Sequence, residues 1–142
     1  KLKGGVTYPH PVSSLDIAAT ALALAGLPKD AKLDGTNLVP YLEGTLKEPP
    51  HEALYWRFGE QMAIRKGDWK LVRASQTNKH YGDVPKEAQL YDLHKDSAEK
   101  TNLAAQHPDK VKDLQAAWDK WNSELKTPAW PATLMGKPLP KE

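Results

Sequence analysis

The side chains that most often carry out chemistry are thinly spread through this sequence of 142 residues. No two histidines have the H-x-H or H-x-x-x-H spacing that brings two imidazoles to one metal ion. The five histidines are His10, His51, His80, His94 and His107. Asp92 and Asp96 lack the glycine and the terminal glutamate of a calcium loop, so we expect both in a solvated turn. The sequence therefore predicts no metal site.

Candidate nucleophiles are also missing from the residues themselves. The chain has no cysteine, which excludes a disulfide framework, a thiolate zinc site and a cysteine nucleophile. No serine has a G-x-S-x-G context, and no glycine-rich loop precedes a helix. On these grounds we predict no catalytic residue in this chain.

Composition and charge narrow the class of protein. The chain is 39% hydrophobic and 27% charged, which suits one compact domain with its own core. Its 20 basic and 18 acidic residues are interspersed, so the net charge of +2 predicts no nucleic-acid surface. No apolar run approaches the roughly 20 residues of a membrane span. The first residues include neither an initiating Met nor a signal-peptide core, so we expect part of a longer protein.

The elements that would position any site form a small antiparallel sheet. Two short runs of alternating polarity, 62–65 and 69–72, are split by Lys66-Gly67-Asp68, which is typical of a hairpin turn. Residues 53–58 and 89–93 are rich in β-formers and supply further strands. The predicted fold class is therefore α+β, with about four antiparallel strands packed against a C-terminal helix and an apolar helix preceding the sheet.

Two helices are expected. Ser13 can cap the first, residues 14–25, with Asp16 at the fourth position of a capping box. Its apolar surface is wider than a small sheet can cover, so we expect Ile17, Leu22 or Leu24 to stay partly exposed. The second helix begins at Pro108 and carries an apolar stripe that should lie on the sheet. That stripe comprises Val111, Leu114, Trp118, Trp121 and Leu125.

The remaining segments are expected to be irregular. Residues 29–50 read as a loop with at most one helical turn, and the four prolines after Thr127 should exclude regular structure from the tail.

The tryptophans suggest a different function, that of a binding module that stacks a glycan or holds a partner chain. Trp118 and Trp121 lie on the helix stripe, and Trp56 and Trp69 lie on strands, so we predict core positions for these four.

Four motifs, in the same order, resemble those of sulfatases. Residues 12–26, VSSLDIAATALALAG, followed by Leu33-Asp34-Gly35, resemble the family's VS-x-x-D-[IL]-x-PT segment and its DG motif. MAIRKGDWKLV at 62–72 resembles AIR-x-GDWKL. QLYDL at 89–93, with Asp96, Glu99 and Asn102-Leu103-Ala104, resembles ELYDL-x-x-DP-x-E-x-x-NLA, and His107-Pro108 opens the final helix as it often does there. Ala19 and Ser97 replace two usual prolines.

The resemblance implies a domain organisation. Sulfatases are similar in fold to alkaline phosphatases, with a large α/β domain and a smaller C-terminal domain. Residues 1–50 would be a linker and helix leading from the missing N-terminal α/β domain, which is the implied partner. Residues 51–126 would be the C-terminal sulfatase subdomain, and residues 127–142 a Pro-rich tail.

The resemblance also implies a reaction for the parent enzyme. It would hydrolyse the sulfate ester of a small molecule or glycan with calcium and a formylglycine made from Cys or Ser in C/S-x-P-x-R. This chain has no such motif, so we expect it to be non-catalytic by itself. The alternative in the same superfamily is a phosphonate or phosphodiester hydrolase. If the parent is like bacterial sulfatases, export to the periplasm or the medium is expected.

One pair of residues is a candidate substrate contact. In sulfatases similar to this sequence, the loop after the WKL strand reaches over the active site of the large domain and can present a histidine to the sulfate. That position corresponds to His80, with Lys79 beside it to add positive charge. The competing interpretation is a mobile polar loop over residues 75–82 with no role in binding.

Overall fold

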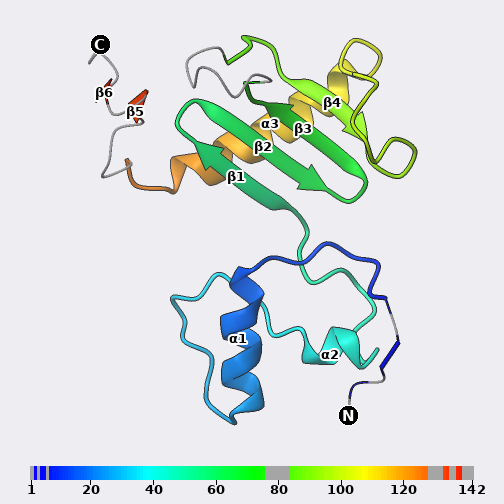
Figure 1. Ribbon diagram of the computed structural model, residues 1–142, viewed down its shortest axis with the longest axis vertical. Coiled ribbons are helices and arrows are strands. Elements are labelled where there is room, and N and C mark those ends of the chain that lie inside the picture. The colour runs from blue at the N-terminus through cyan, green and yellow to red at the C-terminus, as the bar shows by residue number, and fades with distance from the viewer. Residues whose placement is uncertain are drawn as a thin grey trace. The chain divides into compact units, whose positions relative to one another are not determined.

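The structure is a computed structural model that describes residues 2, 4–5, 7–75, 84–127, 133–134 and 137–138. The chain divides into two compact units, Lys1–Glu52 and Ala53–Glu142 (Figure 1). The expectation of one compact domain, drawn from length and composition, is therefore wrong. No helix in the described ranges is long and apolar enough to cross a membrane.

The first unit holds helix α1, Leu15–Leu24, and the single turn α2, Val39–Leu42, as predicted. α1 ends at Leu24 and is followed by Gly26, whose φ of 70° is easily reached without a Cβ. The amide of Leu27 donates back to the carbonyl of Leu22. Ile17 is 69% exposed and Leu24 is 70% exposed. The prediction that apolar side chains of this helix remain uncovered is confirmed.

The second unit is built on a four-stranded antiparallel sheet in the order β1-β2-β3-β4. The strands are β1 Leu54–Phe58, β2 Gln61–Lys66, β3 Trp69–Arg73 and β4 Gln89–Asp92. The β2–β3 turn contains Gly67 with a φ of 60°, which explains the glycine in the predicted hairpin. The predicted fold class is confirmed.

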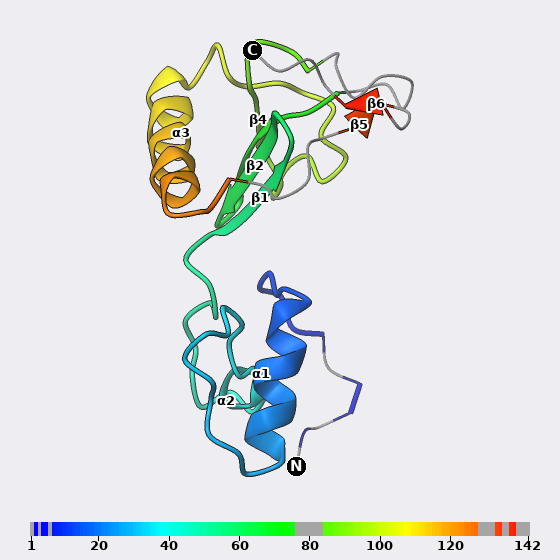
Figure 2. The same ribbon diagram turned by 90° about the vertical axis from the view of Figure 1, so that its left-hand side faces the viewer.

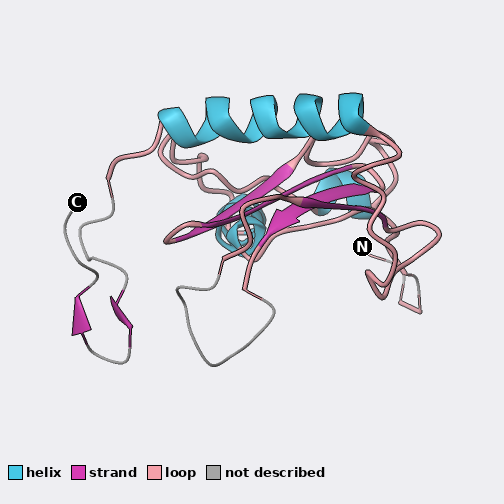
Figure 3. Cartoon of the chain, turned by 90° about the horizontal axis from the view of Figure 1, so that it is seen from above, coloured by secondary structure: helices cyan, strands magenta, loops and turns pink. Residues whose placement is uncertain are grey.

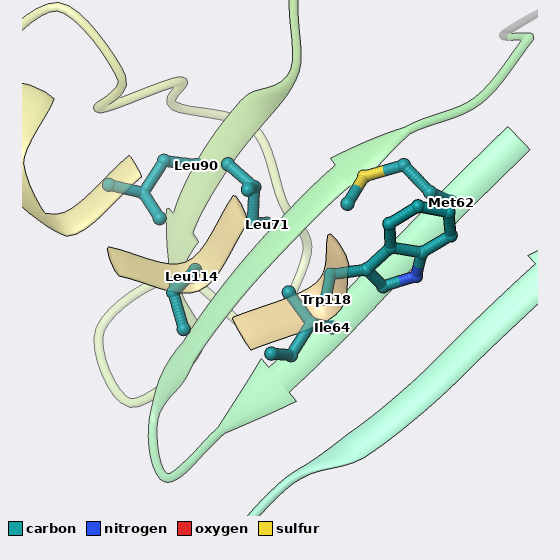
Figure 4. Close-up of a cluster of buried hydrophobic side chains, with 6 residues drawn as sticks. All are labelled: Met62, Ile64, Leu71, Leu90, Leu114 and Trp118. Carbon is teal, nitrogen blue, oxygen red and sulfur yellow. The ribbon is translucent and has the colours of Figure 1, made fainter. Parts of the chain in front are cut away.

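Helix α3, Pro108–Ser123, lies along one face of this sheet (Figures 2 and 3). Inward residues of β2, β3 and β4 meet Leu114 and Trp118 of the helix (Figure 4). Those inward residues are Met62, Ile64, Leu71 and Leu90. Trp118 also donates its indole N–H to the carbonyl of Trp56 at 3.0 Å, which ties the helix to strand β1. The predicted packing on the sheet is confirmed for Val111, Leu114, Trp118 and Trp121. It is wrong for Leu125, which lies beyond the end of α3 and is exposed.

The sheet face opposite α3 corrects one expectation. Trp56 is 49% exposed and Phe58 is 60% exposed, so Trp56 is not a core residue. Because side chains alternate along a strand, the neighbour Tyr55 points towards α3 and stacks on Trp121, while Trp56 points the other way. The position on a strand was predicted correctly, but the face was not.

The Pro-rich tail also differs from expectation. Thr133–Leu134 and Lys137–Pro138 pair as two short antiparallel strands, β5 and β6. Proline is compatible with such an edge position because it lacks only the N–H donor. The prediction that the prolines exclude regular structure is wrong for these four residues.

Candidate functional site

The two predicted substrate contacts, Lys79 and His80, lie outside the described residues. Described residues flank their segment on both sides, since β3 ends at Arg73 and β4 begins at Gln89. The amide of Ser75 donates to Oε1 of Gln61 at 3.0 Å, which fixes the start of the connection to strand β2. In an antiparallel meander, both flanks lie at the same end of the sheet as the β1–β2 turn.

The motif residues of β3 and β4 contact one another on the sheet face opposite α3. Lys70 Nζ lies 2.6 Å from Oε1 of Glu99, and Glu99 has a φ of 54°, an uncommon conformation for a residue with a side chain. Tyr91 is directly opposite Lys70 in the sheet. Burial raises the pKa of Tyr91, and the negative charges of Glu99 and Asp96 raise it further. Lys70 and Glu99 are therefore paired with each other within the domain.

Asn102 covers the free edge of strand β4. Its Oδ1 accepts the amides of Leu90 and Ala104, each at 3.0 Å, and the amide of Leu103 donates to the carbonyl of Leu90 at 2.8 Å. Leu103 and Ala104 pack against the core. The NLA part of the motif thus closes a sheet edge, a structural role that the amide side chain of asparagine is suited to.

The acidic pair of the motif, Asp92 and Asp96, accepts backbone amides. Asp96 accepts the amides of Lys100 and Thr101, and Asp92 accepts the amide of His94 at 3.1 Å. Asp92 is only 8% exposed, so the solvated turn expected for it is not observed. Burial acts to raise the pKa of Asp92, but Lys95 and nearby amides outweigh it and lower the pKa. Nowhere in the described ranges do three or more His, Asp or Glu residues converge on a possible metal position.

The first unit contains a fully buried carboxylate, Asp16. Its oxygens accept the amides of Ser13 at 2.7 Å and Thr36 at 2.8 Å. Nε2 of His51 lies 2.8 Å and 3.0 Å from the two oxygens, and it carries the proton because an ionised carboxylate only accepts. Burial acts to raise the pKa of Asp16, but the hydrogen bonds from Thr36, His51 and Ser13 outweigh it, and the pKa lies below 3.8.

This carboxylate joins three segments that are far apart in the sequence. The capping-box prediction found only the bond to the Ser13 amide; it missed Thr36 and His51, for which no local sequence signal exists. Gly35 allows the approach, because a Cβ there would lie 2.1 Å from the carbonyl oxygen of Leu15. With no exposed surface and all its contacts internal, Asp16 is suited to hold the unit together and not to reach a substrate.

Comparison with known proteins connects this geometry to a family. A family model described as N-sulphoglucosamine sulphohydrolase, C-terminal, matches residues 1–126. Arylsulfatase K of Danio rerio is 34% identical over 127 residues, which is 80% of this chain and 22% of that protein. This chain therefore spans about a fifth of the length of that relative.

Solved structures of related enzymes share this fold. Ps i-CgsB in complex with k-i-k-neocarrahexaose is 27% identical with a TM-score of 0.67, over 89% of this chain and 27% of that one. The phosphonate monoester hydrolase of Agrobacterium radiobacter is 27% identical with a TM-score of 0.53, over 77% of this chain and 24% of that one. Since the family model spans nearly all of the two units up to the Pro-rich tail, the chain belongs to the C-terminal domain family of the sulfatases.

Proposed function

We propose that this chain serves as the C-terminal domain of a sulfuric ester hydrolase. The observation that carries the proposal is the family match over residues 1–126, which spans the helix α1, the sheet and α3. The parent enzyme would hydrolyse a sulfate monoester, and its preceding α/β domain would be the principal partner of this chain. Exposed apolar residues of α1, Ile17 and Leu24 among them, offer a surface that such a domain could cover.

The chemistry of hydrolysis is assigned to the parent and not to this chain. The implied formylglycine has no precursor here, because the chain lacks cysteine and no serine is followed by x-Pro-x-Arg. The implied calcium does not fit the described residues either, since nowhere among them do three or more His, Asp or Glu residues converge on a possible metal position. The role of the domain is then to support the substrate pocket.

Activity assays on the chain and on the complete enzyme test this assignment. The purified chain should not release 4-nitrophenol from 4-nitrophenyl sulfate above a mock preparation, whereas the complete enzyme should. Turnover by the chain alone, retained through a second purification, would show that it carries its own nucleophile.

Within the parent, we assign His80 and Lys79 to the substrate sulfate. An imidazole N–H and an ammonium are both suited to donate to a sulfate oxygen. In the complete enzyme, His80→Ala should lower kcat/KM by roughly 10- to 100-fold and leave stability unchanged. His94→Ala, at an exposed histidine of the same domain, is the matched control. Equal kcat/KM for the two variants would exclude a substrate contact at His80.

A second candidate is a phosphonate monoester hydrolase, favoured by the likeness to the Agrobacterium radiobacter enzyme. The two reactions differ in the atom that is attacked, sulfur or phosphorus. The ratio of kcat/KM for an aryl sulfate to that for an aryl phosphonate monoester decides between them. A free-standing glycan module gains less support, because Trp118 is buried and Trp69 and Trp121 pack against the core.

The cellular location of the parent enzyme is inferred from its family. By analogy with bacterial sulfatases we infer an exported parent enzyme, in the periplasm or the medium. Fractionation of the native host, with the activity followed in each fraction, tests that inference.

A further inference from the structure

Two arginines lie in one row across the sheet. Arg57 of β1 is opposite Met62 of β2, and Met62 is opposite Arg73 of β3. Directly opposed residues in antiparallel strands project from the same face. Met62 belongs to the core beneath α3, so both guanidinium groups lie on the α3 side of the sheet, one on each side of the buried methionine.

The two arginines line a hollow of about 590 Å³ at the end of the sheet where β3 ends. Lys86, an exposed residue shortly before β4, adds a third positive charge, and Glu60 in the β1–β2 turn adds one negative charge. The described lining therefore has three cationic side chains and one anionic side chain. An excess of positive charge in a concave surface raises the local concentration of anions.

The partners of the arginines are neutral. Arg57 donates from Nη1 to Oδ1 of Asn122 at 2.8 Å and from Nη2 to the carbonyl of Lys126 at 3.0 Å. Arg73 donates from Nη2 to the carbonyl of Glu60 at 3.3 Å. Within the described part of the chain, no carboxylate forms an ion pair with either guanidinium. Arg57 is thus held in place by α3, and neither guanidinium is ion-paired with a described carboxylate.

Arg73 supplies a separate observation. Its Nε is buried and has no hydrogen-bond partner among the described residues. A buried donor on a charged group is costly to leave unpaired, so this guanidinium is poorly satisfied as it stands. Because a buried atom cannot touch an anion in the hollow, the contact falls to the Nη groups of Arg73, which lines it.

The geometry points to a sulfate-binding site in this hollow, with Arg73 as the principal ligand, Lys86 as a supporting cation and Arg57 as a fixed positive charge. The sulfate group would be free or carried on a saccharide; the saccharide source rests on the proposed function. The site consists of described residues only and is separate from the contacts assigned to Lys79 and His80. It would give the parent enzyme a second place to hold a multiply sulfated chain.

The test is an NMR titration of the 142-residue chain at constant ionic strength, with sodium sulfate, D-glucosamine 6-sulfate and unsulfated D-glucosamine in parallel. Saturable shifts of the Arg73 Nε–H and of the Lys86 amide are expected with the two sulfated probes. Tighter binding of the sulfated sugar would identify the saccharide source, and equal affinity would identify the free anion. Unsaturable shifts with both sulfated probes would overturn the site.

Variants identify the ligands. Arg73→Gln should weaken sulfate binding by about tenfold or more, since a charged donor pair is lost. Arg73 is partly buried, so Lys86→Gln, at an exposed position, is the companion variant and should weaken binding by about threefold, while Glu60→Gln should tighten it by a similar factor. Arg65→Gln makes the same change of charge on the opposite sheet face and should have no effect. Equal affinities in all four variants would refute the assignment.

The titration is independent of turnover. A complete enzyme that lacks sulfatase activity, together with saturable sulfate binding by this chain, would reject the proposed function and keep the site. Sulfatase activity of the complete enzyme without saturable binding in the hollow would keep the proposed function and reject the site.

Discussion

The Nε2 atom of His51 lies 2.8 Å from the carboxylate of Asp16, a residue 35 positions earlier in the chain. The pair connects the first turn of α1 to the segment that immediately precedes β1, and the carboxylate has no exposed surface. Buried carboxylates are stable only when their oxygens are satisfied, which the amides of Ser13 and Thr36 complete here. The first unit is therefore organised by one acidic side chain.

Acid should weaken the first unit through this group. The folded state lowers the pKa of Asp16 below 3.8, so its stabilising contribution is complete above that pH and is lost as the pH falls through the folded pKa. Hydrogen exchange of the Thr36 amide, followed from pH 6 down to the acid limit, should show this loss. Asp16→Asn should remove most of the dependence, whereas Asp34→Asn, at an exposed acid of the same unit, should keep it. An unaltered profile in Asp16→Asn would assign the effect to other groups.

Gly35→Ala should be among the most damaging small substitutions in the first unit. The added Cβ would lie 2.1 Å from a backbone oxygen of Leu15, so the chain near Thr36 must move away from Asp16. Loss of that amide bond and the accompanying strain should cost roughly 2–4 kcal/mol. Gly4→Ala, where a Cβ meets nothing within 4 Å, is the matched control for thermal unfolding followed by circular dichroism. Similar unfolding of the two variants would contradict the close approach.

Local patterns predicted the elements but not the contacts between distant segments. The strand around Trp69, the turn at Gly67 and the stripe of Val111, Leu114 and Trp118 are short-range features, and the structure has them. Which face of β1 is covered depends on α3, more than 50 residues away, as the 62-residue separation between Trp118 and Trp56 shows. The exposed position of Trp56 could not be deduced from its own strand.

The candidate sites also depend on contacts between distant segments, which local patterns do not predict. Arg57, Arg73 and Lys86 are unremarkable separately in the sequence, and only the strand register brings the two arginines to either side of Met62. The role of His51 has no local sequence signal either, because its partner Asp16 lies on another element. The proposed contacts Lys79 and His80 came from resemblance alone and stay a prediction.

Trp118→Ala should destabilise the second unit strongly. Its side chain is 7% exposed and packs among the core residues of the sheet, so truncation should cost roughly 3–5 kcal/mol. Trp118→Phe, which keeps an aromatic ring but loses the bond to the Trp56 carbonyl, should cost less. Trp56→Ala, at a half-exposed position, should cost under about 1 kcal/mol in the same urea titration. A small effect of Trp118→Ala would place the helix elsewhere.

The Lys70–Glu99 pair should contribute little, because the two side chains are 25% and 33% exposed. Pairs of this kind give about 0–1 kcal/mol after screening by solvent. Glu99 also has a φ of 54°, which glycine adopts without the cost borne by other residues. Glu99→Gly should therefore be more stable than Glu99→Ala by about 1 kcal/mol. Chemical denaturation of both variants measures the difference, and the reverse order would show that the ion pair, not the backbone, governs this position.

On the sheet face opposite α3, the edge formed by β1 is exposed. Trp56 and Phe58 present apolar rings side by side along the outermost strand β1, at 49% and 60% exposure. Rings on an outer strand favour contact between molecules as concentration rises. Phe58→Lys should therefore reduce self-association of the purified chain at high concentration.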